Sequence, residues 1–175
     1  MMLYSQPLDF RKWVEEHRHL LRPPVGNAKI WSNSDFVVFV VGGPNARTDY
    51  HDDPFEEFFY QIEGDIVLRV MEEGRPRDIP IRAGEMFLLP PHVRHSPQRP
   101  VPGSIGLVIE RRRPEGVIDG FEWFCPSCHT LLARVEIQVR DIDRDLPPAF
   151  ERFYANDAAR TCRSCGAVHP GRLAA

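Results

Sequence analysis

A series of short apolar runs in the middle of the chain constrains its fold more than any other feature. The runs are rich in β-branched and aromatic residues, and turn residues separate them: DFVVFVV, EEFFYQIEG, DIVLRVMEEG, RDIPI, EMFLLP and SIGLVIERR. They recur at intervals of about eight to twelve residues, which is typical of a sandwich or barrel. The 17 prolines also favour strands and loops over helices. The sequence therefore predicts an all-β core, with a hairpin through Gly64.

One helix is predicted before this block. The segment DFRKWVEEHRHLL carries apolar residues at helical spacing, with Asp9 as a candidate N-cap. Pro23 and Pro24 end the segment, because the residue before a proline disfavours the helical conformation. The strand block closes shortly before residue 117. We therefore expect a first unit over residues 1–116 and a small C-terminal extension over residues 117–175.

The composition argues against two kinds of partner. A formal net charge of −3 without a basic cluster does not favour nucleic acid or a membrane surface. No apolar run reaches the ~18 residues that a membrane span requires, and the N-terminus lacks an apolar leader segment. The chain is therefore expected to be cytoplasmic, with no nucleic-acid or membrane partner.

The four cysteines fall into two Cys-x-x-Cys pairs, CPSC and CRSC. In a cytoplasmic protein such pairs indicate metal binding or redox chemistry and not structural disulfides. CPSCH also matches a haem-attachment pattern, but haem would leave the second pair unexplained. A thioredoxin-like pair is less favoured because the first pair does not sit in a βαβ pattern. Four sulfur ligands suit tetrahedral Fe or Zn, and the predicted ligands are Cys125, Cys128, Cys162 and Cys165.

A second candidate metal site lies within the strand block and consists of His51, Glu57 and His95. Two imidazoles and one carboxylate make up the facial triad of non-haem Fe(II) oxygenases, which leaves coordination positions open. A closed structural zinc site would instead fill all four positions. Glu57 has the strand parity of Phe59, and its neighbour Glu56 has the opposite parity. Parity alone does not say which face points inward.

Two segments resemble the two sequence motifs of the cupin superfamily. The first is matched by Gly43, His51, Glu57 and Gly64, and the second by Gly84, Pro90, His92 and His95. Asp53 stands where the first motif has a second histidine, and His92 stands where the second motif has a glycine. The resemblance implies a cupin jelly-roll barrel with a two-histidine, one-glutamate metal site. Asp53 is then a candidate for orienting a ligand, and His92 for a structural turn.

Longer runs narrow the resemblance. The chain resembles the 3-hydroxyanthranilate 3,4-dioxygenases of the two-metal bacterial type in four runs and in its two cysteine pairs. In chain order the four runs are PPVGN, VVGGPNARTDYHDDPFEEFFYQ, FLLPPHVRHSPQRP and DGFEWFC. The similarity covers nearly the whole chain. It implies catalytic Fe(II) at the two histidines and the glutamate, and a second Fe (or Zn) at a rubredoxin-like four-cysteine site that turnover does not require. It also implies a homodimer.

The same resemblance assigns residues to the substrate. It implies that Arg99 binds the substrate carboxylate, that Glu110 contacts the polar groups of the substrate, and that Arg47 lies near O₂; Glu57 completes the catalytic set. Asn27 and Val25 are expected to line the pocket. The residues alone leave an alternative open, in which Arg99 and Glu110 form an internal ion pair or Glu110 begins the charged edge ERRR.

The implied reaction is ring cleavage of 3-hydroxyanthranilate by O₂. The product would be 2-amino-3-carboxymuconate semialdehyde, which closes to quinolinate, a precursor of NAD in the kynurenine pathway of tryptophan breakdown. Two alternatives remain at this point. One is a cupin dioxygenase that acts on a related aminophenol or catechol-like acid. The other is a non-catalytic, metal-bound ligand sensor.

Overall fold

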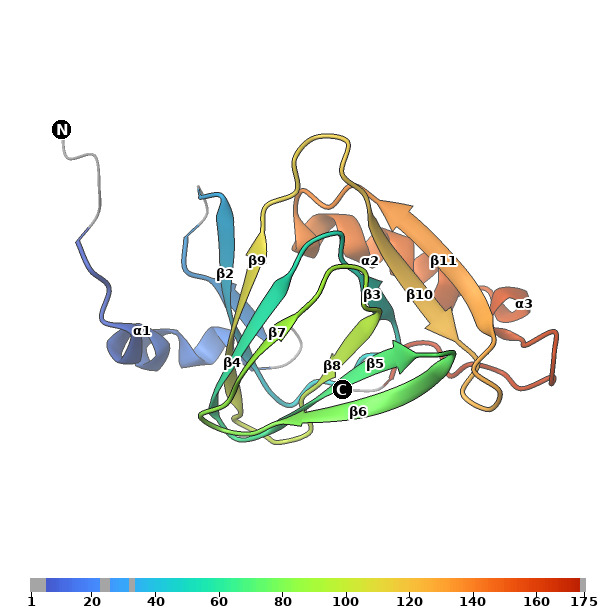
Figure 1. Cartoon of the computed structure of the whole chain (residues 1–175), viewed down its shortest axis with the longest axis horizontal. Helices are drawn as coiled ribbons and strands as arrows, with labels where there is room; N and C mark the ends of the chain where they lie inside the picture. The colour runs from blue at the N-terminus through green and yellow to red at the C-terminus, as the bar shows by residue number, and fades with distance from the viewer. Residues whose placement is uncertain (1–5, 23–25, 32–33, 174–175) are drawn as a thin grey trace.

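Two antiparallel sheets form the body of the protein (Figure 1). The computed structural model describes residues 6–22, 26–31 and 34–173. The five-stranded sheet has the order β1 (Asn27–Lys29), β2 (Phe36–Gly42), β9 (Ile105–Arg111), β4 (Glu57–Glu63) and β7 (Met86–Leu89). The six-stranded sheet has the order β11 (Leu131–Ile137), β10 (Asp119–Phe124), β3 (Tyr50–Asp52), β8 (His95–Gln98), β5 (Ile66–Glu72) and β6 (Arg75–Ile81). This arrangement confirms the predicted jelly-roll barrel.

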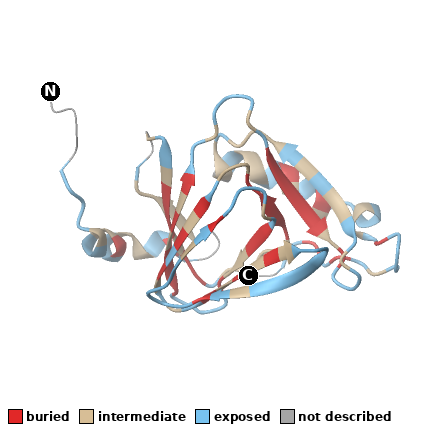
Figure 2. Ribbon diagram, in the orientation of Figure 1, coloured by how far each residue is buried: buried red, intermediate tan, exposed pale blue. Residues whose placement is uncertain are grey.

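Buried residues of the two sheets form the main core, and they are coloured red in Figure 2. Burial alternates along β4, where Glu57, Phe59 and Gln61 are buried while Tyr60 is exposed. Glu56, the residue before the strand, is also exposed. The alternation therefore shows that Glu57 points inward. Both sheets contribute to the apolar cluster of Phe39, Phe59, Ile66, Leu68, Val70, Ile81, Leu89 and Val108.

The connection at Gly64 corrects one prediction. Gly64 has a φ of 64°, a left-handed conformation that glycine adopts without steric cost. However, β4 and β5 lie in different sheets, so Gly64 turns a corner of the barrel and does not close a hairpin. The hairpin lies one connection later, where β5 pairs with β6 along its whole length. A local turn signal does not distinguish these two cases, because both need a tight reversal of the chain.

The N-terminal helix forms where the sequence predicts it. Helix α1 (Phe10–His17) begins after Asp9, whose Oδ1 accepts a hydrogen bond from the backbone N–H of Lys12 at 3.1 Å. A short 3-10 turn, η1 (Arg18–Leu20), follows. Val14 packs with Leu21, Val40 and Ile105 in a second apolar cluster. No helix in the described part of the chain is long and apolar enough to cross a membrane.

The C-terminal segment continues the barrel and adds two helices, α2 (Ile142–Tyr154) and α3 (Asp157–Arg160). Strand β10 pairs with β3, which joins this segment to the six-stranded sheet. Phe121, Trp123 and Phe153 form a third apolar cluster between β10 and α2. The sequence analysis missed α2 because it contains Pro147 and Pro148, which are normally read as helix breakers.

Candidate active site

The barrel brings three predicted metal ligands together between its sheets. His51 lies on β3 and is paired directly with His95, the first residue of β8, while Glu57 begins β4 in the opposite sheet. Each side chain offers a ligand atom, and these atoms all lie within 4.8 Å of one another. The exposed fractions are 8% for His51, 4% for Glu57 and 1% for His95. The cluster therefore forms only because residues from both sheets converge.

The contacts within this group fit a metal ion. Glu57 Oε2 lies 2.7 Å from His95 Nε2, yet this buried oxygen has no partner with hydrogen-bond geometry among the described residues. Burial opposes ionisation of Glu57, but its interactions with the neighbouring His95 and His51 outweigh burial and lower the Glu57 pKa. On the other side of its ring, His95 Nδ1 donates to the carbonyl of Val93 at 2.8 Å. In a neutral imidazole this leaves Nε2 unprotonated and available to a metal.

A cavity of about 600 Å³ opens beside this group. Barrel residues form one part of its wall, and they include Asn27, Arg47, Arg99 and Glu110. Helix α2 and the C-terminal tail form another part, with Ile142, Leu146, Phe150, Tyr154, Arg172 and Leu173. Four of the predicted substrate-site residues therefore share one cavity with His51 and Glu57, two of the three predicted metal ligands. Val25, the remaining predicted lining residue, lies outside the described residues.

Arg99 is a buried cation without a carboxylate partner among the described residues. Its side chain is 1% exposed, and Nη1 donates a hydrogen bond to Gln61 Oε1 at 3.1 Å. Its Nε has no partner in the described part of the chain. Burial lowers the Arg99 pKa to about 10, so the guanidinium remains charged at neutral pH. An unpaired buried charge is costly, and the cavity beside Arg99 is the place where a ligand carboxylate would offset it.

The ion pair between Arg99 and Glu110 is not formed. Glu110 Oε2 instead accepts from Arg113 Nη1 at 2.6 Å, and Glu110 is 8% exposed. Burial and, to a smaller extent, the nearby Glu57 raise the Glu110 pKa, Arg113 opposes both effects, and the net result is a pKa of about 6. Glu110 can therefore either accept or donate a proton near neutral pH. Its position on the cavity wall also shows that it is not part of an exposed charged edge.

Arg47 and His92 take different positions relative to the cavity. Arg47 lies on the wall and pairs with the buried Asp49, which holds its guanidinium in place. His92 has a φ of 62°, is exposed, and makes a 3.0 Å contact to Asp52 Oδ1. A cupin glycine is replaced there by a residue that still adopts the left-handed conformation. His92 is not among the residues that line the cavity.

Two buried charged residues were missed by the sequence analysis. The side chain of Arg113 is 5% exposed and contacts Asp53, Glu110 and Asp119. Asp119 is fully buried, and its Oδ1 lies 2.8 Å from His51 Nε2. Arg113 is the last residue of ERRR and does not share the strand parity of Glu110, so no local signal marked it as a partner of Glu110. No local pattern marked Asp119 as a partner of His51, because the two residues are 68 positions apart.

Arg113 also explains why a further group of potential ligands is not a metal site. His51, Asp53 and Asp119 offer ligand atoms within 4.8 Å of one another. Arg113 Nη2 already lies 2.5 Å from Asp53 Oδ2 and 2.7 Å from Asp119 Oδ1. The guanidinium therefore occupies the position that a cation would take, and it offsets part of the charge of the two carboxylates.

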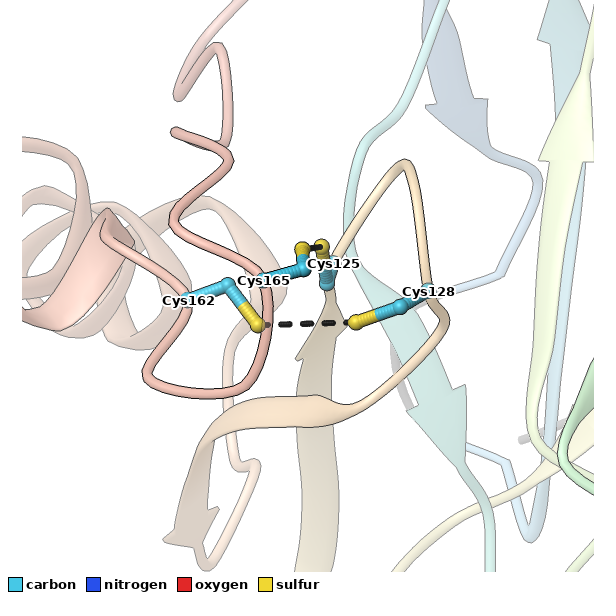
Figure 3. A group of neighbouring side chains, drawn as sticks. All are labelled: Cys125, Cys128, Cys162 and Cys165. Carbon is cyan, nitrogen blue, oxygen red and sulfur yellow. Dashed lines mark hydrogen bonds between the residues drawn. The ribbon is translucent and has the colours of Figure 1, made fainter.

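The four cysteines converge where the turn after β10 meets the turn after α3 (Figure 3). In Figure 1, β10 and α3 lie at the end of the molecule remote from helix α1. Figure 3 shows Cys125 opposite Cys165 and Cys128 opposite Cys162. The Sγ–Sγ distance is 3.5 Å in both pairs. These distances exclude disulfides. Four sulfurs at about 2.3 Å from one zinc ion would lie about 3.8 Å apart, so the spacing suits one tetrahedral metal. The predicted four-cysteine group is therefore formed.

A jelly-roll barrel that holds two histidines and one glutamate beside an internal cavity defines a metal-binding cupin. A sequence model of the family described as 3-hydroxyanthranilic acid dioxygenase matches residues 2–154. The chain belongs to this family. The match covers the barrel, helix α2 and the candidate metal ligands His51, Glu57 and His95, and it ends before the second cysteine pair.

Named relatives extend the similarity over almost the whole chain. The 3-hydroxyanthranilate 3,4-dioxygenase of Shewanella woodyi is 61% identical over 164 residues, which cover 94% of this chain and 87% of that protein. The enzyme of the same name from Burkholderia lata is 58% identical over 172 residues, which cover 98% of this chain and 99% of that protein. A solved cupin-2 domain containing protein from Shewanella frigidimarina aligns with 56% of this chain and 91% of that chain, at 20% identity and a TM-score of 0.47.

Proposed function

We propose that this protein cleaves the ring of 3-hydroxyanthranilate with O₂ and releases 2-amino-3-carboxymuconate semialdehyde. The observation that carries the proposal is Arg99, a buried cation that faces a cavity beside two histidines and a glutamate. A small aromatic acid would supply the carboxylate that Arg99 lacks. The names of the relatives support the same substrate.

We propose Fe(II) as the metal held by His51, Glu57 and His95. Two imidazoles and one carboxylate suit this ion, and such a ligand set does not fill its coordination sphere. When bound, the ion would supply open positions and pass electron density from the aromatic ring to O₂. The substrate provides all four electrons, so both oxygen atoms enter the product and no reductant is consumed.

Each wall residue then has a proposed role. Arg99 binds the carboxylate of the substrate and so fixes the ring relative to the metal ligands. Glu110, whose pKa is about 6, accepts a hydrogen bond or a proton from the hydroxyl or amino group. Arg47 adds positive potential on the part of the cavity wall where O₂ is proposed to approach. Asn27 completes the polar lining.

Helix α2 is proposed to limit access of water to the ring. Its apolar side chains Ile142, Leu146 and Phe150 face the cavity, and Ile142 also packs against the main core. A low local dielectric strengthens the interaction between Arg99 and a carboxylate. The same helix packs on β10, which leads into the first cysteine pair.

The four-cysteine site is proposed to bind a second Fe, or Zn, as a structural clasp for the C-terminal extension over residues 117–175. The two cysteine pairs flank the segment that contains β11, α2 and α3, so a metal there would close that segment into a loop.

A homodimer is also proposed. The outer face of the five-stranded sheet exposes Phe36, Tyr60, Met86 and Leu88, a group of large apolar side chains that a second copy would cover. Sedimentation of the purified protein tests this proposal, and a monomer at micromolar concentration would contradict it.

The enzyme assay uses protein loaded with Fe(II) without air and then mixed with oxygenated 3-hydroxyanthranilate. We expect O₂ and substrate to disappear in equal amounts while the absorbance of the semialdehyde appears. Absence of that absorbance would overturn the proposal.

Turnover of 2-aminophenol, which lacks the carboxylate, distinguishes this activity from that of a cupin dioxygenase for a related aminophenol. Because Arg99 has no carboxylate to bind in that compound, its turnover should be much slower, and equal turnover would contradict the substrate assignment.

A further inference from the structure

Arg113 connects the metal-ligand side of the cavity with its substrate side. Nη1 of Arg113 donates to Glu110 Oε2 at 2.6 Å, and Nε donates to Asp119 Oδ1 at 2.9 Å. Asp119 in turn contacts the imidazole of His51. A single guanidinium therefore holds a residue of the proposed substrate site and the carboxylate that contacts a metal-ligand histidine.

The charges make this arrangement hard to replace. Asp53, Glu110 and Asp119 are all buried, and Arg113 is the arginine that each of them contacts. Asp53 also accepts from the backbone N–H of Phe55 at 2.8 Å. The planar guanidinium presents five donors in fixed directions, whereas an ammonium group is a point charge on a flexible stem. Lysine would therefore keep the charge and lose the simultaneous contacts.

The three carboxylates come from separate parts of the fold. Asp53 follows β3, Glu110 belongs to β9 in the other sheet, and Asp119 begins β10. Arg113 lies in the connection between β9 and β10. It therefore ties both sheets together at the edge of the cavity.

We propose that Arg113 is a positioning residue that orients Glu110 toward the substrate and, through Asp119, orients the imidazole of His51 toward the metal. A carboxylate on one ring nitrogen of a metal-ligand histidine fixes both the ring orientation and the position of its proton. Arg113 in turn fixes the carboxylate. Its kinetic consequence rests on the proposed function, whereas its effect on metal affinity does not.

The chain offers a matched control in Arg134. This arginine also contacts three carboxylates, those of Asp52, Glu122 and Glu136. It is not among the residues that line the cavity. Its side chain is 32% exposed, against 5% for Arg113. A variant at Arg134 therefore removes three carboxylate contacts away from the cavity, and it separates positioning of the site from loss of ion pairs as such.

The experiment compares R113K, R113M and D119N with R134M and the wild type. Fe(II) affinity is measured anaerobically by competition with a chromogenic chelator, alongside thermal unfolding and the kcat and KM for 3-hydroxyanthranilate. We expect R113M and D119N to bind Fe(II) about 10- to 100-fold more weakly, the range found for partners of metal ligands. R113K should recover thermal stability more than Fe(II) affinity. R134M should lose stability and keep the wild-type affinity and KM.

Wild-type Fe(II) affinity and KM in a folded R113M or R113K would overturn the proposal. D119N keeps the size of its side chain, and it decides the question if the Arg113 variants do not fold. Wild-type affinity in D119N would remove the proposed connection to His51. If the wild type binds Fe(II) but does not cleave 3-hydroxyanthranilate, the proposed function fails while the affinity comparison still tests the role of Arg113.

Discussion

Glu57 and Glu110 lie directly opposite each other on the neighbouring antiparallel strands β4 and β9. Both side chains are buried and line the same cavity. Like charges in directly opposed positions destabilise a sheet. Two neighbouring side chains limit this cost, because His95 contacts Glu57 and Arg113 contacts Glu110. A metal ion at Glu57 would limit it further.

This pairing predicts the pH dependence of stability in the metal-free protein. The Glu110 pKa rises from an ordinary 4.5 to about 6 in the folded state. Between about pH 4.5 and about pH 6 the folded state therefore binds more protons than the unfolded state, and stability falls as pH rises through that window. E110Q removes this contribution. The melting temperature of E110Q minus that of the wild type should therefore be larger above about pH 6 than below about pH 4.5.

The same variant should lose activity. E110Q cannot exchange a proton, and general acid–base groups contribute about 10²- to 10⁴-fold to rates. We expect kcat to fall by roughly 10²-fold while Fe(II) stays bound. Metal analysis of E110Q checks that Fe(II) stays bound. Unchanged turnover with Fe(II) bound would show that Glu110 does not act on the substrate.

Arg99→Met should weaken substrate binding without releasing the catalytic metal. Arg99 has no carboxylate partner among the described residues, so its removal leaves no buried carboxylate unpaired. A hydrogen bond to a charged group contributes about 1.5–3 kcal/mol, so KM for 3-hydroxyanthranilate should rise roughly 10- to 100-fold. Turnover of 2-aminophenol should change much less. Loss of Fe(II) would instead indicate that Arg99 supports the fold of the metal site.

Cys162→Ser should remove the second metal and loosen the wall of the cavity. Helix α2 and the tail at Arg172 and Leu173 lie on either side of Cys162 in the chain, and both contribute to that wall. We expect a raised KM with kcat largely retained, because His51, Glu57 and His95 lie outside the segment that the two cysteine pairs flank. S164A in the same CRSC turn is the matched control. A folded C162S without any activity would contradict the role of a clasp.

His92→Gly tests whether His92 takes part in the site. A non-glycine residue in the left-handed conformation costs about 1–2 kcal/mol, and H92G relieves that cost while losing the contact to Asp52. We expect stability to change by less than about 1 kcal/mol and Fe(II) content and kcat to stay the same. A drop in Fe(II) content would mean that His92 supports a metal ligand.

Local spacing in the sequence was enough to predict several features of the site and the fold. Alternation along a strand separates Glu57 from Glu56, because neighbouring side chains point to opposite faces. The spacing within CPSC and CRSC likewise predicts a four-sulfur group, since each pair places two thiols on one tight turn. The turn of the chain at Gly64 was also recognised, although its role in joining the two sheets was not.

Only the tertiary structure decided which charges meet. Glu110 pairs with Arg113 and not with Arg99, because β9 and the following connection bring both residues to the same edge of the cavity. His51 meets Asp119 across 68 positions through the pairing of β3 with β10. Helix α2 forms a wall of the cavity, although the sequence did not predict a helix there because the segment contains two prolines. Strand parity depends on adjacent residues and can be read locally, whereas a buried ion pair depends on the register between segments that are distant in the chain.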